Sequence, residues 1–276
     1  MFKQLLKQPS TRSFVTVPHA TASLGFEAKA DAYAKARPTY PVESINFIRQ
    51  LSKKAPEFAK ILDLGAGTGI MTHLLSQNGY KSLTAVEPVD AMRAKINLPT
   101  SSCLKGTSWS IPVDSSSQDI VMLAQCFHWF DDIQSLTEIH RVLKPGGLVV
   151  LVWNMESKER SEWVAKLRSL YEAYDGSAPQ YRMGYWKNVF DTPEAKSMYQ
   201  LPLQHKRFEF DSKAKRSDVW TRITSKSYIA ILDQAEQDKL QAKVEQVLNE
   251  YDAIPKTDDE QFVYPADTDM YWCYKN

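Results

Sequence analysis

The residues best suited to bind a ligand lie in Ile61–Gly69, whose sequence is ILDLGAGTG. A glycine-rich turn between a strand and a helix lets a ligand approach the backbone closely, because no Cβ stands in the way. The turn is tighter than the dinucleotide fingerprint, which needs a glycine where this chain has Ile70, and it lacks the Lys-Ser/Thr ending of a P-loop. Asp63 adds a carboxylate that would repel a pyrophosphate and attract a cation. The turn therefore predicts a site for a nucleoside that carries positive charge.

Glu87 is the second residue suited to ligand binding, because it ends the apolar run Leu83–Glu87, 22 positions after Gly65. Doubly wound folds place an acidic side chain here, where it accepts hydrogen bonds from ribose hydroxyl groups. A lone Glu at a strand end is more often a solvated loop charge. The spacing from the glycine turn favours the ribose contact instead.

These residues need strands that end along one edge, and the chain from about Lys60 supplies them. Short apolar runs alternate with amphipathic stretches, a pattern that predicts an α/β fold with a parallel, doubly wound sheet. The expected strands are Lys60–Leu64, Leu83–Glu87, Ser102–Gly106, Asp119–Gln125, Leu148–Trp153, Lys206–Phe210 and one within Met270–Tyr274. The expected helices are Gly69–Gln77, one capped by Asp90, Ser135–Leu143 (ended by the breaker Lys144–Gly147), about Lys158–Tyr174 and about Glu236–Tyr251.

The overall composition excludes several classes of protein. The chain has 34 Lys and Arg against 33 Asp and Glu, a net charge of +1, which gives no reason to expect a nucleic-acid or anionic-membrane partner. Its three cysteines lie far apart, which argues against a disulfide scaffold and suits a reducing compartment. The longest strongly apolar stretch, Leu148–Trp153, is too short to span a membrane. We expect a soluble, cytoplasmic protein; its oligomeric state is not indicated.

The chain divides into an N-terminal extension and one domain. Residues 1–26 contain no Asp or Glu, three cations and six hydroxyl residues, which is the composition of either a plain tail or a mitochondrial transit peptide. Residues 27–276 are expected to form a single domain. Within it, 55–154 would be the ligand-binding core, and 155–276 would extend the sheet and add a cap.

Four motifs occur along the chain in a fixed order, namely Leu62–Gly69, Val86-Glu87-Pro88, Ile111-Pro112 and Leu143–Gly147. Taken together, they resemble class I S-adenosylmethionine-dependent methyltransferases. Three further motifs are Tyr33–Pro41, Ala124–Phe130 and Val152-Trp153-Asn154, and they resemble the small-molecule branch that includes trans-aconitate methyltransferase-like proteins. The resemblance implies a Rossmann-like, mainly parallel seven-stranded sheet with an N-terminal lid and C-terminal cap elements, and S-adenosyl-L-methionine as cofactor.

The resemblance also assigns cofactor contacts. Asp63 would lie near the cofactor's amino group, Glu87 would hold its ribose, and Gln125 would lie near its methyl group. Arg37, in the lid, is a candidate partner for its carboxylate. The full set of expected cofactor-binding residues is Asp63, Gly65, Ala66, Gly67, Glu87, Ser108, Trp109, Gln125, Tyr33 and Arg37.

The methyl acceptor is expected beyond the fourth strand, where His128 and Gln125 are the candidate catalytic residues. His128 is either a general base or a packed histidine beside Trp129, and with a carboxylate acceptor no base is needed. Cys126 near His128 suggests a metal or nucleophile, but no further Cys or His follows at ligand spacing, so no metal is predicted. The expected substrate-binding residues are Trp129, Trp153, Arg182, Tyr185 and Trp186.

Three functions remain open at this point. The first is a small-molecule methyltransferase that transfers methyl groups to oxygen, with a carboxylate as one possible acceptor. The second is a protein or nucleic-acid methyltransferase, although Ala124–Phe127 is not the Asn/Asp-Pro-Pro-aromatic box of the amino-methylating nucleic-acid enzymes. The third is a regulator that binds the cofactor without catalysis.

Overall fold

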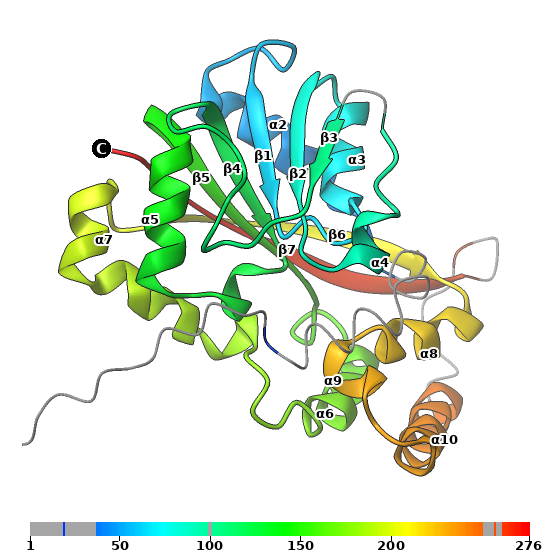
Figure 1. Ribbon diagram of the computed structural model, residues 1–276. Coiled ribbons are helices and arrows are strands. Elements are labelled where there is room, and N and C mark those ends of the chain that lie inside the picture. Colours follow the sequence, from blue (N-terminus) through cyan, green and yellow to red (C-terminus); the bar gives the residue numbers. More distant parts are fainter. Residues whose placement is uncertain (1–18, 20–36, 99–100, 251–256, 258–260) are drawn as a thin grey trace, which may run out of the picture.

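The computed structural model describes residues 19, 37–98, 101–250, 257 and 261–276 (Figure 1). The predicted extension 1–26 lies outside the described residues, with the exception of His19. The predicted lid residue Tyr33 also lies outside them. Among the described residues, no helix has both the length and the apolar character needed to cross a membrane.

A single seven-stranded sheet forms the centre of the molecule, in the order β3-β2-β1-β4-β5-β7-β6. The first five strands in this order are mutually parallel, whereas β7 runs antiparallel to both β5 and β6. The mainly parallel, doubly wound sheet predicted from the alternating pattern is therefore confirmed. The strands are β1 Lys60–Leu64, β2 Ser82–Val86, β3 Ser101–Leu104, β4 Gln118–Ala124, β5 Leu143–Glu156, β6 Gln204–Ala214 and β7 Phe262–Tyr274.

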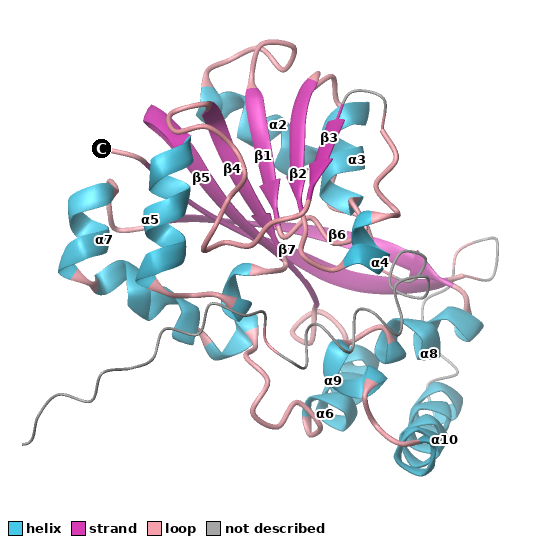
Figure 2. Cartoon of the chain, viewed as in Figure 1, coloured by secondary structure: helices cyan, strands magenta, loops and turns pink. Residues whose placement is uncertain are grey.

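Helices cover both faces of the sheet (Figure 2). On one face, α2 (Val42–Ser52) and α3 (Ile70–Gln77) pack on a core that includes Ile120 and Met122 of β4. On the other face, α5 (Ile133–Val142) and α7 (Pro193–Met198) pack on a core that includes Val121 and Leu123. The apolar run in β4 thus serves two cores, because successive side chains of a strand point to opposite faces.

Two local predictions are wrong. Asp90 was expected to cap a helix, but α4 (Asp90–Arg93) is a single turn with Val89 at its N-cap, and the Asp90 carboxylate pairs with Arg93 at 2.6 Å. Lys144–Gly147 was expected to separate a helix from the following strand. β5 instead begins at Leu143, and the four residues form an irregularity where its register with β4 shifts.

A third apolar core lies in the C-terminal half. It is formed by α6 (Glu162–Glu172), α8 (Arg216–Thr224), α9 (Ser227–Ala230), α10 (Gln234–Glu250) and the start of β7. Figure 1 shows these helices gathered below the ends of the central strands, on the side where β1 and β4 terminate. The helices therefore lie on the side of the carboxyl edge, where a doubly wound sheet binds its ligands.

Candidate active site

The glycine turn after β1 has the backbone shape that only glycine adopts easily. Gly65, Gly67 and Gly69 all have positive φ, at 69°, 57° and 83°. The amide of Gly65 donates a hydrogen bond to the carbonyl oxygen of Val86 at 2.8 Å, which ties the turn to the end of β2. A Cβ at Gly67 would meet only the Met92 Sδ within 4 Å, at 3.9 Å, so the backbone there leaves room for a ligand.

Glu87 is held directly against this turn. Its Oε2 accepts a hydrogen bond from the amide of Gly67 at 2.8 Å, and its Oε1 accepts one from the amide of Val89 at 2.9 Å. The side chain is buried, and burial raises the pKa of the carboxyl, although the two amide hydrogen bonds oppose that change. Each carboxylate oxygen keeps a further lone pair for a hydroxyl donor.

Asp63 lies behind the turn and is 1 % exposed. Its Oδ2 accepts a hydrogen bond from the Thr72 hydroxyl at 2.5 Å, whereas its Oδ1 has no hydrogen-bond partner among the described residues. Burial raises the pKa of Asp63 to about 6, and the nearby charge of Glu87 adds to the rise. A buried carboxylate oxygen without a donor is suited to a ligand that brings a cation or an N–H group.

The opposite wall is the loop that carries Ser108 and Trp109. The Ser135 hydroxyl donates to the Ser108 Oγ at 2.8 Å, and the Trp109 indole N–H donates to the Asp132 Oδ2 at 2.7 Å. Asp132 is also the N-cap of α5, where its Oδ1 accepts a hydrogen bond from the amide of Ser135. The start of α5 therefore positions both wall residues.

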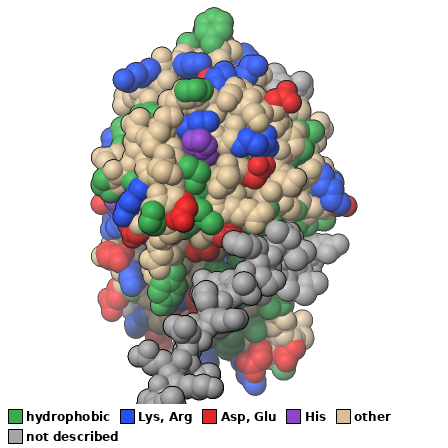
Figure 3. All heavy atoms as spheres, turned by 60° about the vertical axis from the view of Figure 1, so that its left-hand side comes forward, with side chains coloured by type: hydrophobic (Ala, Val, Ile, Leu, Met, Phe, Trp, Pro, Cys, Tyr) green, Lys and Arg blue, Asp and Glu red, His purple; other side chains and the backbone are tan. Residues whose placement is uncertain are grey.

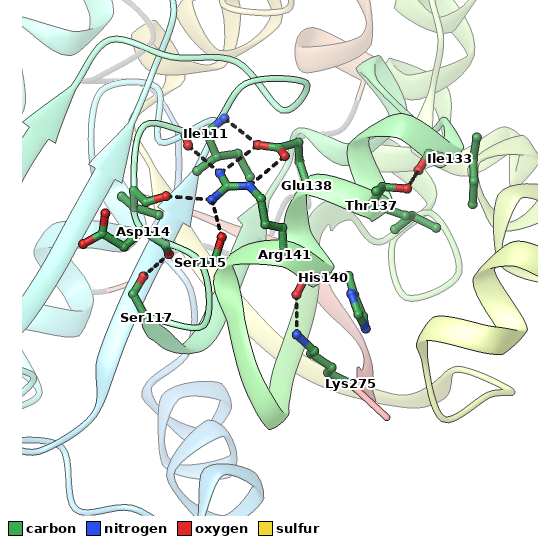
Figure 4. Close-up of polar contacts among 12 residues, drawn as sticks. Ile111, Asp114, Ser115, Ser117, Ile133, Thr137, Glu138, His140, Arg141 and Lys275 are labelled. Atoms are coloured by element: carbon green, nitrogen blue, oxygen red, sulfur yellow. Dashed lines mark hydrogen bonds and ion pairs between the residues drawn. The ribbon is translucent and has the colours of Figure 1, made fainter.

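One turn further along α5, Glu138 and Arg141 brace the same loop (Figure 4). Arg141 Nη2 donates to the carbonyl oxygen of Ile111 at 2.8 Å, and Glu138 Oε2 accepts a hydrogen bond from the amide of Ile111 at 3.1 Å. The two side chains also pair with each other, with 2.8 Å between Arg141 Nε and Glu138 Oε1. Both the amide and the carbonyl oxygen of Ile111 are thus hydrogen-bonded to side chains of α5.

These parts enclose a hollow of about 750 Å³ at the carboxyl ends of β1, β2 and β4. Asp63 and Ala66 support the hollow rather than line it, and the amide of Ala66 donates to the carbonyl oxygen of Val86. Met92, Cys126 and Phe130 are wall residues that the sequence analysis did not assign to the cofactor site. The predicted residues in the wall are Gly65, Gly67, Glu87, Ser108, Trp109, Gln125 and Trp129.

A second hollow, of about 670 Å³, shares Gln125 and Trp129 with the first. Gln125 has a positive φ of 64°, which is uncommon for a residue other than glycine. Its side-chain amide donates to the carbonyl oxygen of Asn154 at 3.0 Å, so it ties the end of β4 to the end of β5. Strained backbone of this kind clusters at functional sites.

The second hollow contains a buried ion pair. Lys226 Nζ lies 3.0 Å from Glu156 Oε1, and Lys226 also lies over the ring of Tyr171. Although burial opposes ionisation, the charges of Lys226 and Arg37 lower the pKa of Glu156 to about 2. Burial lowers the pKa of Lys226 to about 8 against the effect of Glu156. Arg182, which was predicted to bind substrate, lines this hollow and pairs with Asp175.

His128 also lines the second hollow. Its Nδ1 lies 3.1 Å from the indole Nε1 of Trp153, and burial lowers the pKa of the imidazole to about 3. The ring of Trp129 lies beside it, with centroids 5.2 Å apart. His128 is therefore neutral at pH 7 and lies beside Trp129, which lines both hollows.

Comparisons with known proteins decide the family. A model of the methyltransferase domain matches residues 62–151, which include the glycine turn and the first part of β5, up to Leu151. A methyltransferase-like protein of Schizosaccharomyces pombe, itself uncharacterised, is 30% identical over 243 residues, which cover 87% of this chain and 91% of the relative. The chain belongs to the methyltransferase family.

Two further matches are to proteins with named reactions. A malonyl-[acyl-carrier protein] O-methyltransferase of Coxiella burnetii is 33% identical over 91 residues, or 33% of this methyltransferase and 32% of the relative. A phosphoethanolamine N-methyltransferase of Haemonchus contortus, solved with phosphomonomethylethanolamine and S-adenosylhomocysteine, has the same fold. It has a TM-score of 0.51 and 14% identity, and the match covers 92% of this chain and 57% of that one.

The cofactor of this methyltransferase is S-adenosylmethionine, and the first hollow fits it. The open backbone at Gly67 leaves space for the ligand, and the carboxylate of Glu87 can accept hydrogen bonds from ribose hydroxyl groups. Asp63 does not line the hollow, so its carboxylate would act on the cofactor's ammonium group by its charge, from behind the turn. Cys126 is not a nucleophile here, because burial raises the pKa of its thiol well above the ordinary value. Among the described residues, no cluster of His, Cys, Asp and Glu could hold a metal ion.

Several predicted residues lie elsewhere. Arg37 was expected at the cofactor, but it lines the second hollow, where its Nη2 donates to the carbonyl oxygen of Ser225 at 3.3 Å. Trp153 and Trp186 were expected to wall the acceptor pocket, but they are 0 % and 1 % exposed and pack in the core of the sheet. Tyr185, also expected in that wall, is 67 % exposed and lines neither hollow.

The acceptor side also contains residues that sequence reasoning missed. Asn154 and Glu156 follow the predicted end of a strand, so the strand-end position that singled out Glu87 could have pointed to them. Lys226 and Tyr228 belong to a segment with no recognisable motif. They reach the hollow only because α9 folds back against the end of β5.

Proposed function

We propose that this methyltransferase transfers a methyl group to an oxygen atom of a small molecule and that this oxygen belongs to a carboxylate. The observation that carries the proposal is the second hollow, which adjoins the cofactor hollow at Gln125 and Trp129. It is lined by three cations (Arg37, Arg182 and Lys226) against two carboxylates (Glu156 and Glu172). A carboxylate that enters this hollow would meet cations to hold it and would be oriented toward the shared wall.

The chemistry places few demands on the protein beyond alignment. When bound, S-adenosylmethionine supplies a methyl group on a sulfonium, which moves to the nucleophile while the sulfur keeps the electrons of the broken bond. A carboxylate is already ionised at pH 7, so no residue has to remove a proton. The residues in the two hollows then act by orienting the acceptor and by excluding water.

The shape and charge of the site support a small acceptor. Residues of the C-terminal cap, including Tyr171 on α6 and Tyr228 on α9, line the second hollow together with residues at the end of β5, as in a pocket for a small molecule. On the face drawn in Figure 3, basic side chains lie among acidic and uncharged ones, which is unlike a nucleic-acid-binding surface. We assign the chain to the small-molecule branch that includes trans-aconitate methyltransferase-like proteins.

Oxygen as the methylated atom has support from one relative, which is named as an O-methyltransferase of a malonyl group. The neighbour of known structure is named as an N-methyltransferase, and its likeness concerns the fold alone. A carboxylate fits the second hollow better than an amine does, because the three cations of the hollow outnumber its two carboxylates, Glu156 and Glu172.

The test is a methylation assay with S-adenosylmethionine that carries a deuterated methyl group. The purified protein would be incubated separately with aliphatic mono-, di- and tricarboxylic acids, phenols, primary amines, total cell protein and total RNA. We expect a labelled product from a carboxylic acid that loses its methyl group in mild alkali, as a methyl ester does. Label in an amine, an ether, protein or RNA instead would overturn the proposal. Binding of S-adenosylhomocysteine, measured by calorimetry, verifies that the cofactor site is intact in the sample.

A further inference from the structure

Trp153 makes a part-buried hydrogen bond that determines which ring nitrogen of His128 carries the proton. The indole Nε1 of Trp153 lies 3.1 Å from Nδ1 of His128, and an indole N–H can only donate. Nδ1 of His128 must therefore present its lone pair and cannot carry a proton. The donor, Trp153, is completely buried in the core of the sheet, whereas His128 is partly exposed.

The remaining proton lies on the other ring nitrogen. A neutral imidazole carries one proton, and with Nδ1 acting as acceptor that proton is on Nε2. The charged form, which needs a proton on both nitrogens, would set an N–H of His128 against the N–H of Trp153. Burial opposes the charged form as well, since it lowers the pKa of His128 to about 3.

We infer that Trp153 is a positioning residue that fixes His128 as the Nε2–H tautomer, so that His128 meets the methyl acceptor as a hydrogen-bond donor and not as a base. The tautomer follows from the Trp153–His128 bond alone. The role toward the acceptor rests on the proposed function, because His128 lines the second hollow.

This assignment matches the demands of the proposed reaction. Nδ1 accepts the hydrogen bond from Trp153 and Nε2 carries a proton, so His128 has no free lone pair with which to take a proton from an acceptor. An N–H directed at a carboxylate can hold one of its oxygens while the other remains available to react. The acceptor of such a site is one that arrives already ionised.

The tautomer can be read directly by nitrogen NMR on the full-length protein labelled with ¹⁵N-histidine. Spectra would be recorded at pH 7 without an acceptor, and with and without S-adenosylhomocysteine. The His128 signals are those that disappear in His128→Gln. We expect one protonated and one unprotonated ring nitrogen, with the proton on Nε2. A proton on Nδ1, or on both nitrogens, in the wild-type protein would overturn the inference.

Trp153→Phe tests the positioning role, and Trp186→Phe is its matched control. Trp186 is buried to the same degree and its ring lies 4.4 Å from that of Trp153, but its indole N–H donates to the carbonyl oxygen of Tyr181. We expect Trp153→Phe to populate the Nδ1–H form and Trp186→Phe to leave the His128 signals unchanged. An unchanged tautomer in folded Trp153→Phe would refute the positioning role. If Trp153→Phe does not fold, the wild-type spectrum still tests the tautomer.

The methyltransferase activity of two His128 variants distinguishes a hydrogen-bond donor from a general base. His128→Gln supplies an N–H donor of similar reach but no base, whereas His128→Ala supplies neither. For a donor role we expect His128→Gln to keep activity within about tenfold of wild type, and His128→Ala to lose more, mainly through KM. If His128 were a base, both variants would lose kcat alike, by roughly 10²–10⁴-fold. The spectra need no acceptor, so a failure of the proposed function would leave the tautomer result standing.

Discussion

The carboxylate of Glu87 and the backbone amide of Gly67 lie 2.8 Å apart, and this contact joins the two motifs that we predict to bind the cofactor. Glu87 follows β2 and Gly67 follows β1, and the two strands are parallel neighbours in the sheet. The acid therefore has two tasks, because it holds the glycine turn in shape and presents its remaining lone pairs to the ligand.

The substitution Glu87→Gln tests both tasks, because it changes the hydrogen bonding of the side chain and leaves its volume almost unchanged. One carboxylate oxygen becomes an NH₂ group, which cannot accept a hydrogen bond from the amide of Gly67 or Val89, nor from a ribose hydroxyl. We expect the affinity for S-adenosylhomocysteine to fall about 10–100-fold in calorimetric titration. Asp90→Asn is the control, because Asp90 is exposed and pairs only with Arg93 and Lys105 among the described residues. Equal affinities in the two variants would contradict the assignment.

The substitution Gly67→Ala tests whether the open space beside Gly67 is the space that the cofactor occupies. A Cβ at Gly67 clashes with nothing in the protein, so the substitution costs only the strain of a positive φ, roughly 1–2 kcal/mol. Gly176→Ala is a matched control, since Gly176 has a φ of 53° and also has no neighbour near a Cβ. We expect similar losses of unfolding free energy in urea for both variants, but weaker cofactor binding only for Gly67→Ala. Unaltered cofactor affinity in Gly67→Ala would place the ligand elsewhere.

Asp63 should make both stability and cofactor affinity depend on pH. Its folded pKa of about 6 lies above the ordinary value of 3.8, so the folded state favours the protonated form. Stability is therefore lost as the pH rises from about 4 to 6, by at most about 3 kcal/mol, and stays lower above that range. Cofactor affinity should change in the opposite direction, because only the charged carboxylate attracts an ammonium group.

Asp63→Asn isolates these effects, since its side-chain oxygen can still accept the Thr72 hydrogen bond. We expect urea unfolding to show the variant gaining stability relative to wild type as the pH rises through 4 to 6. Its cofactor affinity should be weak and insensitive to pH over the same range. A wild-type protein whose stability relative to Asp63→Asn does not change between pH 4 and 7 would show that Asp63 titrates normally.

The cofactor side of the site could be predicted because its information is local. The glycine turn and Glu87 lie at the ends of two successive strands, and the geometry of a doubly wound sheet brings such ends together in every protein of that class. Arg37 is different, because its partner Ser225 is 188 positions away. No local rule indicates that a lid residue meets the cap rather than the cofactor.

The acceptor side could be predicted only in part. Glu156 and Lys226 are separated by 70 positions, and neither belongs to a motif. Trp153 was wrongly predicted to line the acceptor pocket for a different reason. A tryptophan at a strand end is equally suited to a pocket wall and to the core. Alternation along β5 would have placed Trp153 on the same face as Leu151 and Val149, which pack in the core beneath α5.

Lys226 should make KM for a carboxylate acceptor depend on pH in the alkaline range. Burial lowers the pKa of Lys226 to about 8, against an ordinary value of 10.5, so the second hollow loses a positive charge as the pH rises through 8. We expect KM for the acceptor to rise up to about tenfold between pH 7 and 9, while kcat changes little, because the cation binds the acceptor in the ground state and the transition state alike.

Lys226→Arg separates this cause from a general effect of alkali. A guanidinium stays protonated over this range, so the rise in KM should disappear in the variant. Lys187→Arg is the matched control, because Lys187 lies over the rings of Trp186 and Tyr271 and lines neither hollow. It should keep the wild-type profile. A wild-type KM that stays flat from pH 7 to 9 would mean that the Lys226 charge does not hold the acceptor, and the buried pair with Glu156 would then serve the fold alone.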